Sequence, residues 1–178
     1  MEYKRTEDFL FKNVDVKERY GEKYVDHFLD QYKIYLSMLD NISDRRQKSN
    51  EFYLGINTVI IGALGYVETK GTAYDSVVFF IAPIVGILIS YSWFQIINSY
   101  KNLNSAKFNV IHAIEQRLPM TMFETEWKLL EEGKNKKAYY PFTHIEIHIP
   151  QIFIGIYLIL FLVNVPWWRI GRVFRCLF

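Results

Sequence analysis

The 178-residue sequence has only one cysteine, Cys176, so it can form no disulfide within the chain and no cysteine-based metal site. It also lacks a large excess of either charge: the net charge is +2, which gives nucleic-acid binding no support. It has no phosphate-binding loop, because the stretch GYVETKG does not fit that spacing, and it has no nucleophile elbow. We therefore predict a protein that is not an enzyme, with no catalytic residues and no cofactor.

Metal ligands are also scarce. His144 and His148 are four residues apart and would share one face of a helix, as zinc ligands do. A third ligand would have to be Glu146, which points elsewhere, or a remote residue such as His112. A membrane enzyme acting on lipid would need a histidine–carboxylate pair near the interface, and only His144, Glu146 and His148 could supply one. Histidines at the headgroup level of a membrane helix are more often interfacial polar groups, and we predict no metal site.

Ionisable residues are missing from three stretches, although 22% of the chain is charged and 51% is hydrophobic. Residues 77–97 carry no charge, and residues 149–168 are similar and end on two tryptophans, as is typical of a membrane–water boundary. Residues 52–67 are shorter, but only residues 68–76 separate them from the second stretch. We predict an all-α integral membrane protein with about three transmembrane helices and long cytoplasmic helical extensions.

The absence of Asp, Glu, Lys, Arg and His from these three segments argues against a pump or an ion-coupled transporter, which usually need such a residue in the bilayer. A passive pore stays open as an alternative. Its lining would come from the polar side chains that the segments do contain, namely Asn57, Thr58, Ser90 or Asn164.

Small residues recur three and four apart in the first segment, at Gly55, Thr58, Gly62 and Gly65. This spacing places them on one helix face, which we call the glycine face, and allows another helix to approach closely. Two interpretations remain open: the face packs the first span against the second within one chain, or it packs one copy of the chain against another.

Lysine and arginine are concentrated before residue 52, with ten residues, and in residues 98–148, with seven, whereas residues 68–76 contain only Lys70. This distribution predicts a cytoplasmic N-terminus and a loop outside. Three spans would then place the tail outside, which conflicts with its three arginines, Arg169, Arg172 and Arg175. Three alternatives stay open: the third segment spans against the positive-inside rule, it re-enters the membrane on the same side, or the tail lies flat on a headgroup surface. The side of the membrane on which the C-terminus lies is therefore not predicted.

The cytoplasmic parts show helical periodicity. Apolar residues three and four apart run from Tyr24 to Ile42 and again from Leu103 to Leu118, so the two stalks are expected to pair antiparallel. The predicted organisation is an N-terminal arm (1–22), a cytoplasmic stalk helix (23–51), a transmembrane hairpin (52–97), a cytoplasmic helical region (98–148), a third membrane segment (149–168) and a basic tail (169–178).

Two polar groups flank the hairpin where it enters the membrane. Such residues can simply anchor the chain to lipid phosphates, or they can form a hydrogen-bonded lock within or between subunits. We favour the lock, because asparagine is a poor helix former and its frequency here needs a reason. The predicted lock consists of Arg45, Arg46, Asn50 and Asn57 on one arm and Asn98, Lys101 and Asn104 on the other.

Several of these residues lie in blocks that carry a family resemblance. The stretches ISDRRQKSNEFYLGINTVIIGALGYV, SYKNLNSAKFNVIHAIEQRLP and YYPFTHIEIHIP, with the EW at Trp127, resemble the RipA family of small octameric bacterial membrane proteins over most of residues 30–165. The resemblance implies a multi-pass protein of the bacterial inner membrane, a homo-oligomer of eight subunits and no enzyme activity.

The sequence therefore predicts a non-enzymatic, homo-oligomeric scaffold or interaction platform of the bacterial envelope. The expected partners are other copies of the chain, membrane lipid and an unidentified cytoplasmic protein, but no nucleic acid. An oligomeric ion channel or membrane-perturbing effector is the alternative.

Overall fold

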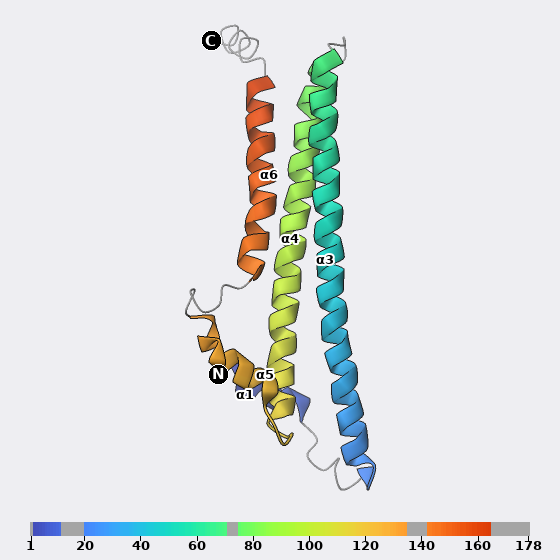
Figure 1. Cartoon of the computed structure of the whole chain (residues 1–178), viewed down its shortest axis with the longest axis vertical. Helices are drawn as coiled ribbons and strands as arrows, with labels where there is room; N and C mark the ends of the chain where they lie inside the picture. The colour runs from blue at the N-terminus through green and yellow to red at the C-terminus, as the bar shows by residue number, and fades with distance from the viewer. Residues whose placement is uncertain (1, 12–19, 71–74, 135–141, 165–178) are drawn as a thin grey trace, which may run out of the picture. The chain divides into compact units, whose positions relative to one another are not determined.

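The computed structural model describes residues 2–11, 20–70, 75–134 and 142–164, and within these ranges every regular element is helical (Figure 1). Three helices are long and apolar enough to cross a membrane. The prediction of an all-α membrane protein is therefore confirmed. The elements are α1 (Glu2–Leu10), α3 (Tyr24–Lys70), α4 (Asp75–Glu115), α5 (Met122–Leu129), the 3-10 turn η1 (Glu131–Gly133) and α6 (Phe142–Asn164).

The helix α3 is continuous and contains both the predicted stalk and the first apolar segment. It begins after Gly21, whose φ of 78° is a left-handed conformation that favours glycine, and the Tyr24 amide donates to the Gly21 carbonyl at 3.1 Å. Three internal glycines do not interrupt the helix, in keeping with the frequency of glycine in membrane helices. The short first segment is thus part of a long helix.

Two prolines lie inside the apolar helices, Pro83 in α4 and Pro150 in α6, and both are buried. Membrane helices tolerate proline because neighbouring groups satisfy the carbonyl that it frees. The third candidate span covers Ile145–Asn164 and so begins four residues before the predicted segment 149–168. This longer range contains Glu146 and His148, which are ionisable, and the predicted bounds of the membrane segment stay a prediction.

The chain divides into two compact units. We call Met1–Lys48 with Ile97–His144 the stalk unit, and Ser49–Ile96 with Ile145–Phe178 the membrane unit. The predicted N-terminal arm contributes α1 to the stalk unit. The basic tail, with Trp167, Trp168 and the three arginines, lies outside the described residues.

The stalk unit is held together by the two predicted apolar stripes. Tyr32 and Leu39 of α3 are buried against Ile111 of α4. Near the end of α4 the Arg117 guanidinium lies 3.3 Å from the centroid of the Phe11 ring, which follows α1. Partly buried side chains from α3, α4 and α5 surround this core: Tyr35, Leu36, Phe108, Ile114, Leu118 and Phe123.

The membrane unit packs α3, α4 and α6 around aromatic side chains. The Trp93 ring stacks on Tyr53 of α3, with centroids 5.9 Å apart, and lies 6.1 Å from Phe153 of α6. Nearer the other end of α6, the rings of Phe80 and Phe161 lie 5.1 Å apart. These contacts hold the three apolar helices side by side (Figure 1). Polar side chains lie between the same helices.

Candidate functional site: a polar cluster between the membrane helices

Asn57 joins the three helices of the membrane unit. Its side chain is fully buried, and its Nδ2 donates to the Tyr53 carbonyl of its own helix at 2.8 Å. Its Oδ1 accepts from the Ser90 hydroxyl of α4 at 3.0 Å. The Tyr157 hydroxyl of α6 donates to the Asn57 backbone carbonyl at 3.3 Å. One asparagine therefore has hydrogen bonds to all three helices, where an unsatisfied polar group would be costly.

Asn50 makes a second polar junction two turns earlier on α3. Its Oδ1 accepts from the Trp93 indole N–H at 2.9 Å, and its Nδ2 donates to Glu146 Oε1 of α6 at 2.9 Å. The Glu146 side chain is almost completely buried. The amide thus uses its donor and its acceptor on different helices, which fixes the register of α4 and α6 against α3.

A glycine allows α6 to approach α4 closely. The Tyr157 ring lies against Gly86, where an added Cβ would come within 2.6 Å of Tyr157 Cε1 and Cε2. Only glycine fits this contact without a shift of the ring. Sequence reasoning missed the pair; the available signal was a tyrosine in the middle of an apolar segment, since membrane tyrosines are usually enriched at the interfaces.

The glycines of the glycine face are uncovered within the part of the chain that the structure describes. Gly55, Gly62 and Gly65 are exposed, and a Cβ added to any of them would meet nothing within 4 Å. The Thr58 hydroxyl is exposed and donates to the Leu54 carbonyl of its own helix at 2.8 Å. Among the described residues, nothing packs against these three glycines inside the hairpin, and their contact with another copy of the chain stays a prediction.

The residues of the predicted lock are placed differently from one another. Asn50 and Asn57 form the two junctions above, with partners that the sequence had not indicated, and the lock as a whole stays a prediction. In the stalk unit, Asn104 Oδ1 is buried and has no hydrogen-bond partner within the described ranges. Of the remaining residues of the predicted lock, Arg45 and Lys101 are exposed, and Arg46 and Asn98 are half-buried.

The four polar residues considered as a pore lining all have hydrogen-bond partners inside the chain. Asn57 and Ser90 bond to each other, and Thr58 bonds to its own helix. Asn164 Nδ2 donates to the Leu160 carbonyl at 2.8 Å. Asn57 and Ser90 thus join two helices, whereas Thr58 and Asn164 are exposed and bond only to the backbone of their own helices in these contacts.

A buried carboxylate organises the stalk unit. Glu115 is fully buried at the end of α4; its Oε1 accepts from the Phe123 amide at 3.0 Å and from the Tyr32 hydroxyl at 3.3 Å. Its Oε2 accepts from the Glu124 amide at 3.2 Å. Thr121, at the N-cap of α5, makes no side-chain cap bond. Glu115 therefore caps α5 from another helix and offsets the positive end of its dipole.

A buried ammonium lies on the same α3–α4 contact. Lys107 is only 7% exposed, and its Nζ lies 4.4 Å from the centroid of the Tyr35 ring. This geometry is a cation–π interaction, which is strongest where the cation has lost its water. The contact adds a second charged group to the hydrophobic core of the stalk unit.

Tyr32 is expected to remain protonated well beyond the ordinary tyrosine range. Burial, followed by the charge of Glu115 and its hydrogen bond, raises the pKa of Tyr32 to about 12. Because the pKa is raised above its unfolded value near ~10, the stabilisation is complete below that pH and is lost as the pH rises through about 12.

Ultraviolet titration of tyrosinate tests this expectation, with Tyr32→Phe identifying the Tyr32 component. Glu115→Gln removes the negative charge and should move the Tyr32 pKa back towards the ordinary value. A Tyr32 component that titrates with the exposed tyrosines in the wild-type chain would contradict the buried contact.

Of the two histidines considered as metal ligands, His148 lies on the third candidate span, whereas the His144 side chain lies outside the part of the chain that the structure describes. His148 Nδ1 lies 3.0 Å from Gln151 Oε1, and the His148 side chain is exposed. Among the described residues, no three His, Cys, Asp or Glu side chains come close enough together to hold a metal ion.

Comparison with known proteins adds a family. No curated protein and no solved structure matches the chain significantly. Residues 29–166, well over half of the sequence, match the octameric membrane protein family (8xMP). The match covers the three candidate spans almost completely, together with both polar junctions and Glu115. The chain therefore belongs to the octameric membrane protein family.

Proposed function

We propose that the protein is a non-enzymatic homo-oligomer that acts as a structural scaffold or interaction platform of the bacterial inner membrane. The family supports self-association, and the resemblance to RipA proteins supports the bacterial inner membrane and eight subunits. The lysine and arginine distribution supports a cytoplasmic N-terminus, which would place the stalk unit in the cytoplasm as a surface for other proteins.

The observation that carries this proposal is the uncovered glycine face on α3. Membrane helices associate through small residues because these let the backbones approach closely. Among the described residues of one chain the face is uncovered, while the buried side of α3, with Asn57 and Leu64, faces the other helices. A second copy of the chain is the partner that an oligomeric membrane protein supplies for such a face.

The use of polar groups also supports a scaffold. The asparagines of α3 hold α4 and α6, and Glu115 holds α5, so the chain uses its polar side chains for fixing helices. This arrangement suits a protein whose task is to keep a defined shape in a larger assembly.

Replacing Gly62 with phenylalanine tests the proposed contact. The bulky ring would separate neighbouring helices, so native mass spectrometry of the purified protein is expected to show smaller assemblies. Leu88→Phe is the matched control, because Leu88 is an exposed position of α4 and should leave the assembly intact. An unchanged oligomer in Gly62→Phe would contradict the role of the glycine face.

Ion flux through liposomes containing the intact oligomer separates the scaffold from the channel alternative. A tight vesicle is expected for a scaffold. Flux that disappears in Gly62→Phe but persists in Leu88→Phe would instead assign the assembly to an ion channel.

A further inference from the structure

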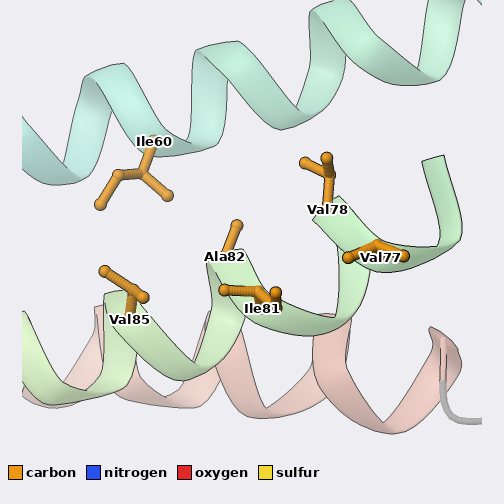
Figure 2. A pocket seen from close by; sticks show the side chains of 6 residues that line it. All are labelled: Ile60, Val77, Val78, Ile81, Ala82 and Val85. Carbon is orange, nitrogen blue, oxygen red and sulfur yellow. The ribbon is translucent and has the colours of Figure 1, made fainter. Parts of the chain in front are cut away.

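An aliphatic groove opens on the membrane unit between α3 and α4 (Figure 2). Its volume is about 350 Å³, and no polar side chain lines it. The walls are open to the surroundings, since Val77, Ile81 and Val85 are each exposed by about half. The six lining residues are Ile60, Val77, Val78, Ile81, Ala82 and Val85.

The groove covers most of the depth of one bilayer leaflet. The α4 wall from Val77 to Val85 rises about 12 Å, and α3 rises about 15 Å from Ile60 to its last residue, Lys70. Half of the hydrocarbon core is also about 15 Å thick. If Lys70 lies at the headgroup level, Ile60 therefore lies near the bilayer midplane.

The helix that contributes Ile60 to the groove ends in a cation. Lys70 is exposed at the C-terminus of α3, and its Nζ lies 5.7 Å from the centroid of the Tyr66 ring. Tyrosine and lysine are residues that anchor helices at the membrane interface. The combination offers hydrocarbon contact along one leaflet and a positive charge at its surface.

We propose that this groove binds one phospholipid, whose acyl chain lies along Val78, Ala82 and Ile60 and whose anionic phosphate pairs with Lys70. The lipid fills the groove between α3 and α4 and contacts both helices. It is a structural lipid, bound at a defined place rather than shared with the bulk bilayer.

The groove is distinct from the glycine face. Ile60 is two residues from both Thr58 and Gly62, which places it about 200° around the helix from each of them. A neighbouring copy seated on the glycine face would leave the groove open to lipid. A second copy inserted into the groove is the competing occupant, and the experiment below distinguishes the two.

Native mass spectrometry of the delipidated oligomer, titrated with phosphatidylglycerol or phosphatidylcholine, tests the site. The wild-type oligomer should bind one lipid per chain and prefer phosphatidylglycerol about fivefold, which corresponds to ~1 kcal/mol for one lysine near an anionic lipid. Ala82→Phe fills the groove and should weaken binding about tenfold or more. Lys70→Gln should bind both lipids equally, whereas Lys70→Arg should keep the preference.

The control is Leu88→Phe, which adds the same bulk to α4 outside the groove and should bind lipid like the wild type. Equal lipid binding by Ala82→Phe and wild type would overturn the proposal. A chain with Ala82→Cys as its only cysteine, made in a Cys176→Ser background, provides a second measurement. Disulfide-linked pairs formed through position 82 would also overturn it, because they would place another copy in the groove.

Discussion

Glu115→Ala is expected to detach α5 from the stalk unit and to destabilise that unit by ~3–5 kcal/mol, the range for breaking a buried polar network. The substitution leaves two backbone amides, those of Phe123 and Glu124, and the Tyr32 hydroxyl without their acceptor. Each buried donor left unsatisfied costs about 1–3 kcal/mol. Hydrogen exchange at the Phe123 and Glu124 amides, together with thermal unfolding, measures the loss.

The matched control for this experiment is Glu126→Ala, which removes an exposed carboxylate from the same region. It should leave amide exchange in α5 nearly unchanged. Glu115→Gln retains an acceptor oxygen and should fall between the two. Full protection of the Phe123 amide in Glu115→Ala would show that α5 does not depend on this cap.

Gly86→Ala is expected to have the second large effect, although it adds only one methyl group. The new Cβ would overlap the Tyr157 ring, so the ring must shift or α6 must move away. Overpacking of this kind costs about 1–3 kcal/mol. The Tyr157–Asn57 hydrogen bond would be lost as well, at ~0.6–1.7 kcal/mol for a bond between membrane helices. Unfolding in mixed micelles measures the sum.

Two further variants separate this contact from a general effect of alanine. Gly155→Ala on α6 meets nothing within 4 Å and should change stability by less than ~0.5 kcal/mol. The double variant Gly86→Ala/Tyr157→Ala removes the ring that causes the overlap. Its destabilisation should be smaller than the sum of the two single effects, because the residues are in contact. Additive effects would be inconsistent with the packing described here.

The apolar segments were sufficient to predict the fold class, because a helix of about 20 uncharged residues has few alternatives to spanning a membrane. The long helix α3 was also predictable, because no residue between 23 and 67 breaks the helical pattern strongly enough to end the helix. The start of the third span was harder to predict, because Glu146 and His148 interrupt the hydrophobic run and the candidate span begins before them, at Ile145. In the folded chain Glu146 is buried and accepts a hydrogen bond from Asn50, a residue 96 positions away in sequence.

The polar cluster was predictable in part. Asn50 and Asn57 stood out as asparagines inside a helical pattern, but their partners Ser90 and Trp93 are ordinary members of an apolar segment. For the glycines, the sequence pattern did not indicate which one allows two helices of the chain to approach closely. Regular spacing drew attention to the uncovered face, whereas the single Gly86 that permits a close approach has no pattern around it. Spacing reports which residues share a face and leaves open what covers that face.

The cap on α5 was not predictable from local sequence. The usual signal is a short polar side chain at the N-cap, and Thr121 occupies that position without making the bond. The acceptor is instead Glu115. In the sequence, nothing distinguishes Glu115 from the other charged residues of the stalk helices. Such long-range caps become visible only when the turn that joins the two helices is known.

The order in which the chain is synthesised gives the polar cluster a role in biogenesis. The Asn57–Ser90 and Asn50–Trp93 bonds lie within the first two spans, so they can form once the α3–α4 hairpin has left the ribosome and entered the bilayer. The bonds from Glu146 and Tyr157 require α6, which emerges later. In a hairpin inserted before α6, the Asn50 amide would still lack its Glu146 acceptor, and the arrival of α6 would supply it.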